Sequence, residues 1–139
     1  MTQQDSQDQF LKAVASLAEA NAAFAAGTLK SVPHADARGA ALSAALLSMA
    51  ACHGVLLQTP VQIDSNGEFS LVALKAPGAN SLYGCGSYGK KLAERLTKHK
   101  GRTGAFGPAT FYADSGWCRL NHFNAEAMVL EYAAELQAG

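Results

Sequence analysis

The sequence has little charge, few cysteines and no long apolar run, and each shortage excludes a class of protein. Charged residues make up 16% of the 139 residues and hydrophobic ones 49%, a composition unlike that of disordered, collagen-like or coiled-coil chains. The longest apolar stretch, residues 40–51, is interrupted by Ser43 and Ser48 and is too short to span a bilayer. The composition predicts one globular domain over residues 1–139, with residues 1–5 as a disordered terminus.

Three cysteines, Cys52, Cys85 and Cys118, are an odd and sparse set. A disulfide framework requires an even and denser set, so we expect reduced thiols. The first ten residues contain neither the basic region nor the apolar core of a signal peptide. These features predict a cytoplasmic protein without a membrane segment.

Two Ala-rich helices are predicted at the start of the chain. The first covers residues 5–26, where Ser6 and Gln9 have the spacing of a capping box and Gly27 supplies a left-handed stop. The second ends at Gly54. The short connection between them predicts an antiparallel helical hairpin.

The rest of the chain predicts strands and two further helices. Residues 61–71 alternate around an Asn-Gly pair, and residues 111–118 flank a second polar turn, so each predicts a β-hairpin. A basic helix lies between the hairpins, and Asn124 is placed to cap a last helix. The predicted fold is α+β with the order ααββαββα: about four antiparallel strands, an N-terminal helical hairpin, and helices packed on one face.

The neutral net charge conceals a basic segment at residues 90–102, which holds six cations against the single anion Glu94. Helical spacing places Leu92 toward the core and Lys91 and Arg95 on one side. Such a segment attracts phosphate backbones or acidic surfaces. The predicted binding residues are Lys90, Lys91, Arg95, Lys98, Lys100 and Arg102.

A glycine-rich loop precedes this helix and suggests an alternative site. Gly84, Gly86 and Gly89 have G-x-G-x-x-G spacing and are followed by Lys90 and Lys91. Backbone amides of such a loop and a helix N-terminus can bind phosphate. However, the loop does not follow a strand directly, as a dinucleotide fingerprint does.

Cysteine and histidine residues suggest two weaker sites. The order Cys85, His122, Asn124 is that of a thiol nucleophile with its base and orienting group, although order alone does not bring the side chains together. Cys118 and His122, four residues apart, are the candidate zinc ligands, but no Cys-x-x-Cys pair supports them. We therefore predict no catalytic residue, metal or cofactor.

Other titratable residues have structural interpretations. His53, at the end of a helix, is interpreted as a cation that the helix dipole favours, and His34 as an exposed loop residue. Glu126 falls in the first turn of the last helix, where negative charge is favourable. Glu131 and Glu135 are interpreted as part of the solvent face of that helix.

The function predicted from these features is a non-catalytic binding or inhibitory module. It would engage an anionic macromolecule (nucleic acid, nucleoprotein or an acidic protein surface) through residues 90–102. The alternative is a binder of a nucleotide or phosphorylated ligand at residues 84–91, and a third hypothesis is a cysteine-dependent enzyme. The Ala-rich helices are also candidates for a homodimer contact, although packing onto the sheet is the preferred interpretation.

Overall fold

The computed structural model describes the backbone of residues 2–57, 62–66, 69–75, 91–92, 95, 110–111 and 117–138. It describes the side chains of residues 2–31, 33–57, 91–92, 95 and 125–138. The elements, in chain order, are α1 (Gln3–Ala25), α2 (Ser31–Cys52), β1 (Gln62–Asn66), β2 (Phe69–Lys75), β3 (Thr110–Phe111), β4 (Trp117–Asn121) and α4 (His122–Ala138).

Helix α1 begins with a capping box formed by Thr2 and Asp5. The Thr2 hydroxyl accepts the N–H of Asp5, and the Asp5 carboxylate accepts the N–H of Thr2, each at 3.1 Å. The predicted box of Ser6 and Gln9 is wrong, because Ser6 lies inside the helix and donates its N–H to the Thr2 carbonyl. The earlier box satisfies the N–H groups of Thr2 and Asp5 in the same reciprocal way and lengthens the helix.

Within the terminus predicted to be disordered, Gln3 to Asp5 are helical. The side-chain amide of Gln3 donates to the carbonyl of Cys52 at 2.7 Å. This bond joins the first turn of α1 to the last turn of α2. It also satisfies one of the carbonyls that a helix C-terminus leaves without an internal partner.

Gly27 and Gly54 end α1 and α2, as predicted. Both have left-handed backbone, with φ of +79° and +77°. The residue after each glycine donates its N–H to the carbonyl five residues earlier, at 3.0 Å after Gly27 and 2.9 Å after Gly54. This is the Schellman arrangement, and glycine adopts its left-handed position without the penalty that a Cβ imposes.

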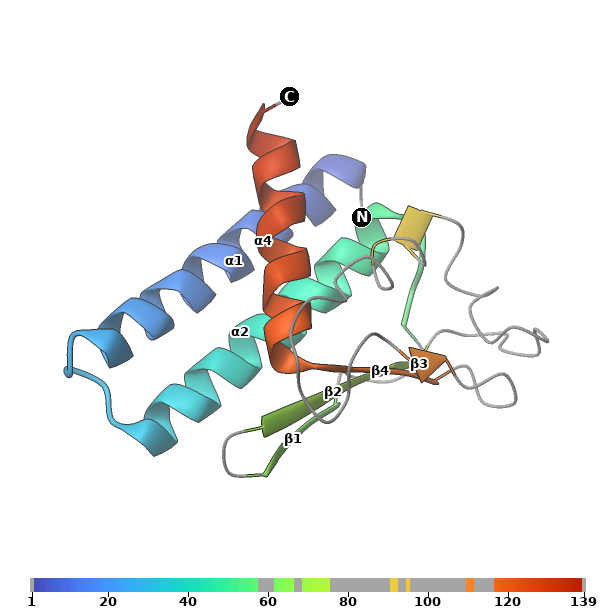
Figure 1. Cartoon of the computed structure of the whole chain (residues 1–139). Helices are drawn as coiled ribbons and strands as arrows, with labels where there is room; N and C mark the ends of the chain where they lie inside the picture. Colours follow the sequence, from blue (N-terminus) through green and yellow to red (C-terminus); the bar gives the residue numbers. More distant parts are fainter. Residues whose placement is uncertain are drawn as a thin grey trace.

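The described core is built by three helices. Figure 1 shows α4 crossing the antiparallel α1–α2 pair, and small buried residues such as Ala13, Ala41 and Ala45 let the helix backbones approach closely. The largest fully buried side chains come from all three helices and from the basic segment. They are Phe10, Leu17, Leu42, Leu46, Met49, Leu92, Met128 and Val129.

Four short strands form an antiparallel sheet in the order β1-β2-β4-β3. Ile63 pairs with Val72, Val72 with Leu120, and Phe111 with Cys118. β4 continues directly into α4, and Figure 1 shows the sheet beside the first turns of that helix. The strands are described as backbone only.

The predicted α+β class is wrong for the body of the molecule whose side chains are described, which is all helical. The prediction laid the helices over one face of a sheet. Instead, α1, α2 and α4 bury their apolar faces against one another. Helices rich in Ala can pack this closely, so helix-on-helix contact buries the apolar stripes of the described core.

No helix in the described part of the chain is both long and apolar enough to cross a membrane. The predicted cytoplasmic location and the single-domain organisation stay predictions.

Candidate functional site

The basic segment is described at three positions, and they differ in exposure. Leu92 is buried, as its helical spacing predicts, while Lys91 is exposed and Arg95 half-buried. All three have helical backbone. Burial of Leu92 therefore attaches this part of the segment to the helical body and leaves Lys91 in solvent. The other predicted binding residues, Lys90, Lys98, Lys100 and Arg102, lie outside the described residues.

The end of α2 presents His53 to the basic segment. His53 is the C-cap residue of α2, and the left-handed Gly54 turns the chain immediately after it. The Nδ1 atom of His53 is 2.8 Å from the carbonyl oxygen of Met49. Because a carbonyl oxygen only accepts, Nδ1 carries the proton and donates it.

Arg95 binds the other nitrogen of the His53 ring. Its Nε–H donates to Nε2 of His53 at 2.9 Å. Since an arginine nitrogen only donates, Nε2 carries no proton and the ring is neutral. The interpretation of His53 as a helix-end cation is therefore wrong.

The surroundings of His53 also disfavour its charged form. Burial lowers the pKa of His53, and the positive charges of Arg95 and Lys91 lower it further. The bond to Met49 and the carboxylate of Glu135 act in the opposite direction and are outweighed. Desolvation and the two nearby cations therefore lower the pKa of His53 by more than the helix C-terminus raises it, and the sequence-based interpretation considered only the helix C-terminus.

Arg95 makes two further contacts, both with α4. Its Nη1 donates to a carboxylate oxygen of Glu135 in an ion pair. Its guanidinium carbon lies 4.5 Å from the ring centre of Tyr132, the distance of a cation–π contact. Arg95 therefore joins the basic segment to the ends of α2 and α4, and its charge is paired within the chain.

Tyr132 forms the base of this cluster. Its ring centre lies 5.0 Å from those of Phe10 and His53. Burial, followed by the neighbouring Cys52, raises the pKa of Tyr132 to about 12. Burial also raises the pKa of the Cys52 thiol, against the weaker lowering effect of its hydrogen bond to Tyr132. Both groups are therefore protonated at neutral pH, which suits an anchoring cluster rather than nucleophilic chemistry.

A second polar cluster lies where α1, α2 and α4 meet. His34 stacks on Phe24, with ring centres 4.2 Å apart, and its Nε2 lies 2.8 Å from Oδ1 of Asn21. His34 is thus a half-buried residue of α2 rather than the predicted exposed loop residue. Burial and the charge of Arg38 lower its pKa.

Glu126 belongs to this second cluster, and its environment disfavours the negative charge that the sequence-based interpretation gave it. Burial raises its pKa, and the opposing effects of Arg38 and the side chain of Asn21 are smaller. Its Oε1 atom is buried without a hydrogen-bond partner among the described residues. Desolvation therefore outweighs the favourable position near the helix N-terminus that the sequence indicated.

The weaker candidate sites are only partly described. Cys85, Gly84, Gly86 and Gly89 lie outside the described residues, so the phosphate loop and the thiol nucleophile stay predictions. Across the residues that are described, no group of three or more His, Cys, Asp or Glu side chains is placed to hold a metal.

Cys118, His122 and Asn124 are described as backbone. Cys118 lies in β4, opposite Leu74 of β2, and His122 begins α4. Asn124 lies within α4 and does not cap it, because the helix starts two residues earlier. β4 runs into α4 without a loop, so the helix has no separate capping residue at position 124.

The sequence pattern alone does not identify His53, Tyr132 and Glu135 as partners of Arg95. Arg95 is separated from His53 by 42 residues and from Glu135 by 40. Local spacing reports only on neighbours within a helix or hairpin, so it carries no signal for such pairs. Comparison with protein-family models, curated proteins and solved structures finds no match to this chain.

Proposed function

We propose that this protein is a non-catalytic binding module that engages an anionic macromolecule through its basic segment, residues 90–102. The observation that carries the proposal is the attachment of the described part of this segment, at Leu92 and Arg95, to the helical body. Leu92 is buried and Arg95 is held by three partners, while Lys91 points into solvent. In this arrangement Arg95 positions the segment, and the remaining cations contact the partner.

Counting Glu135, the described partner of Arg95, with the segment changes its formal charge little. The segment has a formal net charge of +5, and counting Glu135 with it leaves +4. The rest of the chain is acidic, because the whole chain is neutral. Such an asymmetry orients an anionic partner toward one part of the surface and speeds its association.

Attachment of the segment also favours binding for an entropic reason. A free basic tail loses conformational entropy when a partner orders it. Here Leu92 and Arg95 order part of the segment before binding, so that cost is reduced there. The proposal therefore predicts that weakening the attachment lowers affinity even when no contacting cation is removed.

Fluorescence anisotropy with a labelled single-stranded oligonucleotide and a labelled poly-glutamate peptide tests the proposal. The double variant K91E/K98E is compared with K30E/K75E, which makes the same charge change outside the segment and outside the α1–α2 groove. We expect K91E/K98E to raise Kd by more than about tenfold and to lower the salt dependence by roughly 0.7–0.9 per lost phosphate contact. The control variant should change Kd by less than about threefold.

The two probes separate the classes of partner. Tighter binding of the oligonucleotide identifies nucleic acid, and tighter binding of the peptide identifies an acidic protein surface. No binding of either probe at low salt, or equal losses in both double variants, contradicts the proposed function.

A further inference from the structure

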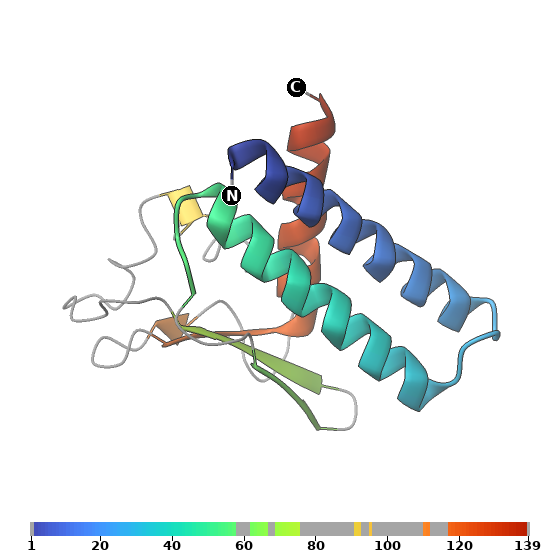
Figure 2. The ribbon, with the colours of Figure 1, turned by 180° about the vertical axis from the view of Figure 1, so that it is seen from behind.

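The outer face of α2 lacks the charge that a solvent-facing helix ordinarily has. From position 39 to position 52 the helix contains no charged residue. Helices that are apolar all round are ordinarily buried. Ala40, Ala44 and Leu47 are nevertheless exposed, Leu47 to 39%. Figure 2 shows α1 and α2 uncovered on the side away from α4.

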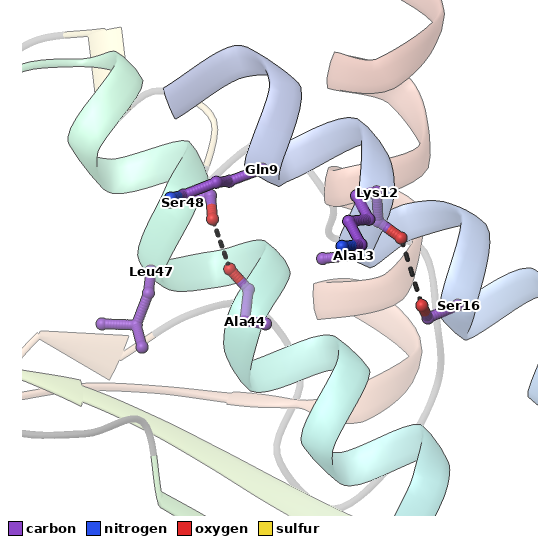
Figure 3. Close-up of a pocket in the computed structure, with 7 residues that line it drawn as sticks. All are labelled: Gln9, Lys12, Ala13, Ser16, Ala44, Leu47 and Ser48. Atoms are coloured by element: carbon purple, nitrogen blue, oxygen red, sulfur yellow. Dashed lines mark hydrogen bonds between the residues drawn. The ribbon is translucent and has the colours of Figure 1, made fainter. Parts of the chain in front are cut away.

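This face is hollowed between the two helices. A groove of about 430 Å³ is lined from α1 by Gln9, Lys12, Ala13 and Ser16 and from α2 by Ala44, Leu47 and Ser48 (Figure 3). The two serine hydroxyls donate to carbonyls of their own helices, at 3.2 Å in α1 and 2.8 Å in α2. Ala13, Ser16, Ala44 and Ser48 are small, and the two serines are satisfied within their own helices, so this part of the groove permits close approach of another helix.

The charged residues of α1 are arranged so that opposite charges face one another when two copies of the helix pack antiparallel. Lys12 and Glu19 are both exposed and lie seven residues apart, two turns along the same face. The midpoint between them falls beside Ser16. A second α1 packed antiparallel about that point brings Lys12 opposite Glu19 of the partner subunit, and the reverse contact follows by symmetry.

The exposed apolar residues of α2 are also arranged so that two antiparallel copies fit together, about a point level with Ser16. Leu47 and Ala40 are also two turns apart, and their midpoint falls beside Ala44. An antiparallel second α2 therefore sets the large Leu47 over the small Ala40 of the partner subunit. Ser16 and Ala44 line the same groove, so a single twofold axis across the groove satisfies both helices.

We propose that this α1–α2 face is the interface of a homodimer with twofold symmetry. Charge complementarity on α1 and size complementarity on α2 identify a second copy of this chain as the occupant. The zero net charge of the chain adds no long-range repulsion between copies. The interface uses residues other than the basic segment, so it stands independently of the proposed function.

Sedimentation velocity over a concentration series tests the dimer with L47E, which places a charge in the centre of the interface. The matched control is L56E, because Leu56 is 76% exposed and does not line the groove. We expect the wild type and L56E to dimerise and L47E to require at least about tenfold higher concentration. A monomeric wild type, an open series of larger oligomers, or equal behaviour of L47E and L56E overturns the proposal.

A charge exchange keeps the proposal testable if L47E does not fold. K12E and E19K each place like charges opposite one another across the axis, so each should weaken the dimer. The double variant K12E/E19K restores opposite charges and should recover it. Failure of the double variant to recover dimerisation, with all variants folded by circular dichroism, overturns the antiparallel arrangement.

Discussion

His53 shows how two neighbours determine the protonation of one residue. The Met49 carbonyl accepts the proton on Nδ1, and Nε2 accepts the Nε–H of Arg95. Protonation of Nε2 would place two donors against each other and disrupt the bond. The neutral ring is thus part of the contact that attaches the basic segment.

The first prediction concerns the pH dependence of stability at His53. The pKa of the folded state lies below the ordinary value of 6.5, so the unfolded state binds more protons between those two values. Stability should therefore fall as pH decreases below about 6.5 and should be independent of this group above it. Urea denaturation from pH 5 to pH 8 measures the effect.

The H53Q variant serves as the control, because His34 also has a lowered pKa and titrates in the same direction. The difference in unfolding free energy between wild type and H53Q isolates His53. A difference that does not change with pH would contradict the assignment of a neutral, pH-sensitive ring.

A second prediction separates the contributions of Arg95. Glu135 is 51% exposed, so E135Q should cost less than about 1 kcal/mol, and the cost should disappear at high salt. R95A should cost more, about 1–2 kcal/mol, since it also removes the packing on Tyr132 and the donor to His53. Urea unfolding measures both, with the exposed K91A as the control; equal costs for E135Q and R95A would contradict this division.

At the level of single residues, the sequence predicted that Leu92 is buried, but it did not predict which residues Arg95 contacts. The helical period identified Leu92 as a core residue, because that signal is local. It assigned Arg95 to a free basic face and Glu135 to solvent, because their pairing depends on how α4 packs beside the basic segment. Tertiary packing determines such contacts, and no spacing within one element reports on it.

The helices show which signals work at the level of one element. Gly27 and Gly54 were identifiable because a left-handed stop after an apolar period depends on a few adjacent residues. The start of α1 was less determined, since Thr2 with Asp5 and Ser6 with Gln9 both fit the spacing of a capping box. The structure adopts the earlier box, which adds further hydrogen-bonded residues to the helix.

A third prediction tests the two helix stops. G27A and G54A should each lower the unfolding free energy by about 1 kcal/mol, because alanine disfavours left-handed backbone. Among the described residues, nothing beyond the chain neighbours of each glycine lies within 4 Å of a Cβ placed there, so this cost is conformational rather than steric.

Asparagine tolerates the left-handed region better than alanine, so G27N and G54N should lose less stability than the alanine variants. Thermal and urea denaturation compare the four variants. An alanine variant as stable as wild type would show that the left-handed turn is not required in solution.

For the whole molecule, the sequence pattern predicted where the N-terminal helices lie but not what their apolar faces pack against. Their Ala-rich faces were assigned to a sheet, because two hairpin signals supplied one. Instead, Phe10, Leu46 and Val129 meet in a core between three helices. The choice between a helix and a sheet as the second layer depends on the complementarity of distant faces, which a local pattern does not encode.

The last prediction tests whether the basic segment belongs to this cooperative core. Leu92 is 1% exposed and lies in the same cluster as the residues of α1, α2 and α4. L92A should therefore cost about 2–5 kcal/mol, the range for removing a buried leucine side chain. L130A is the matched control, because Leu130 is 49% exposed and its change should stay within about 0.5 kcal/mol. If L92A and L130A cost the same in urea denaturation, the segment is not packed into the helical body, and the attachment on which the proposed function depends is absent.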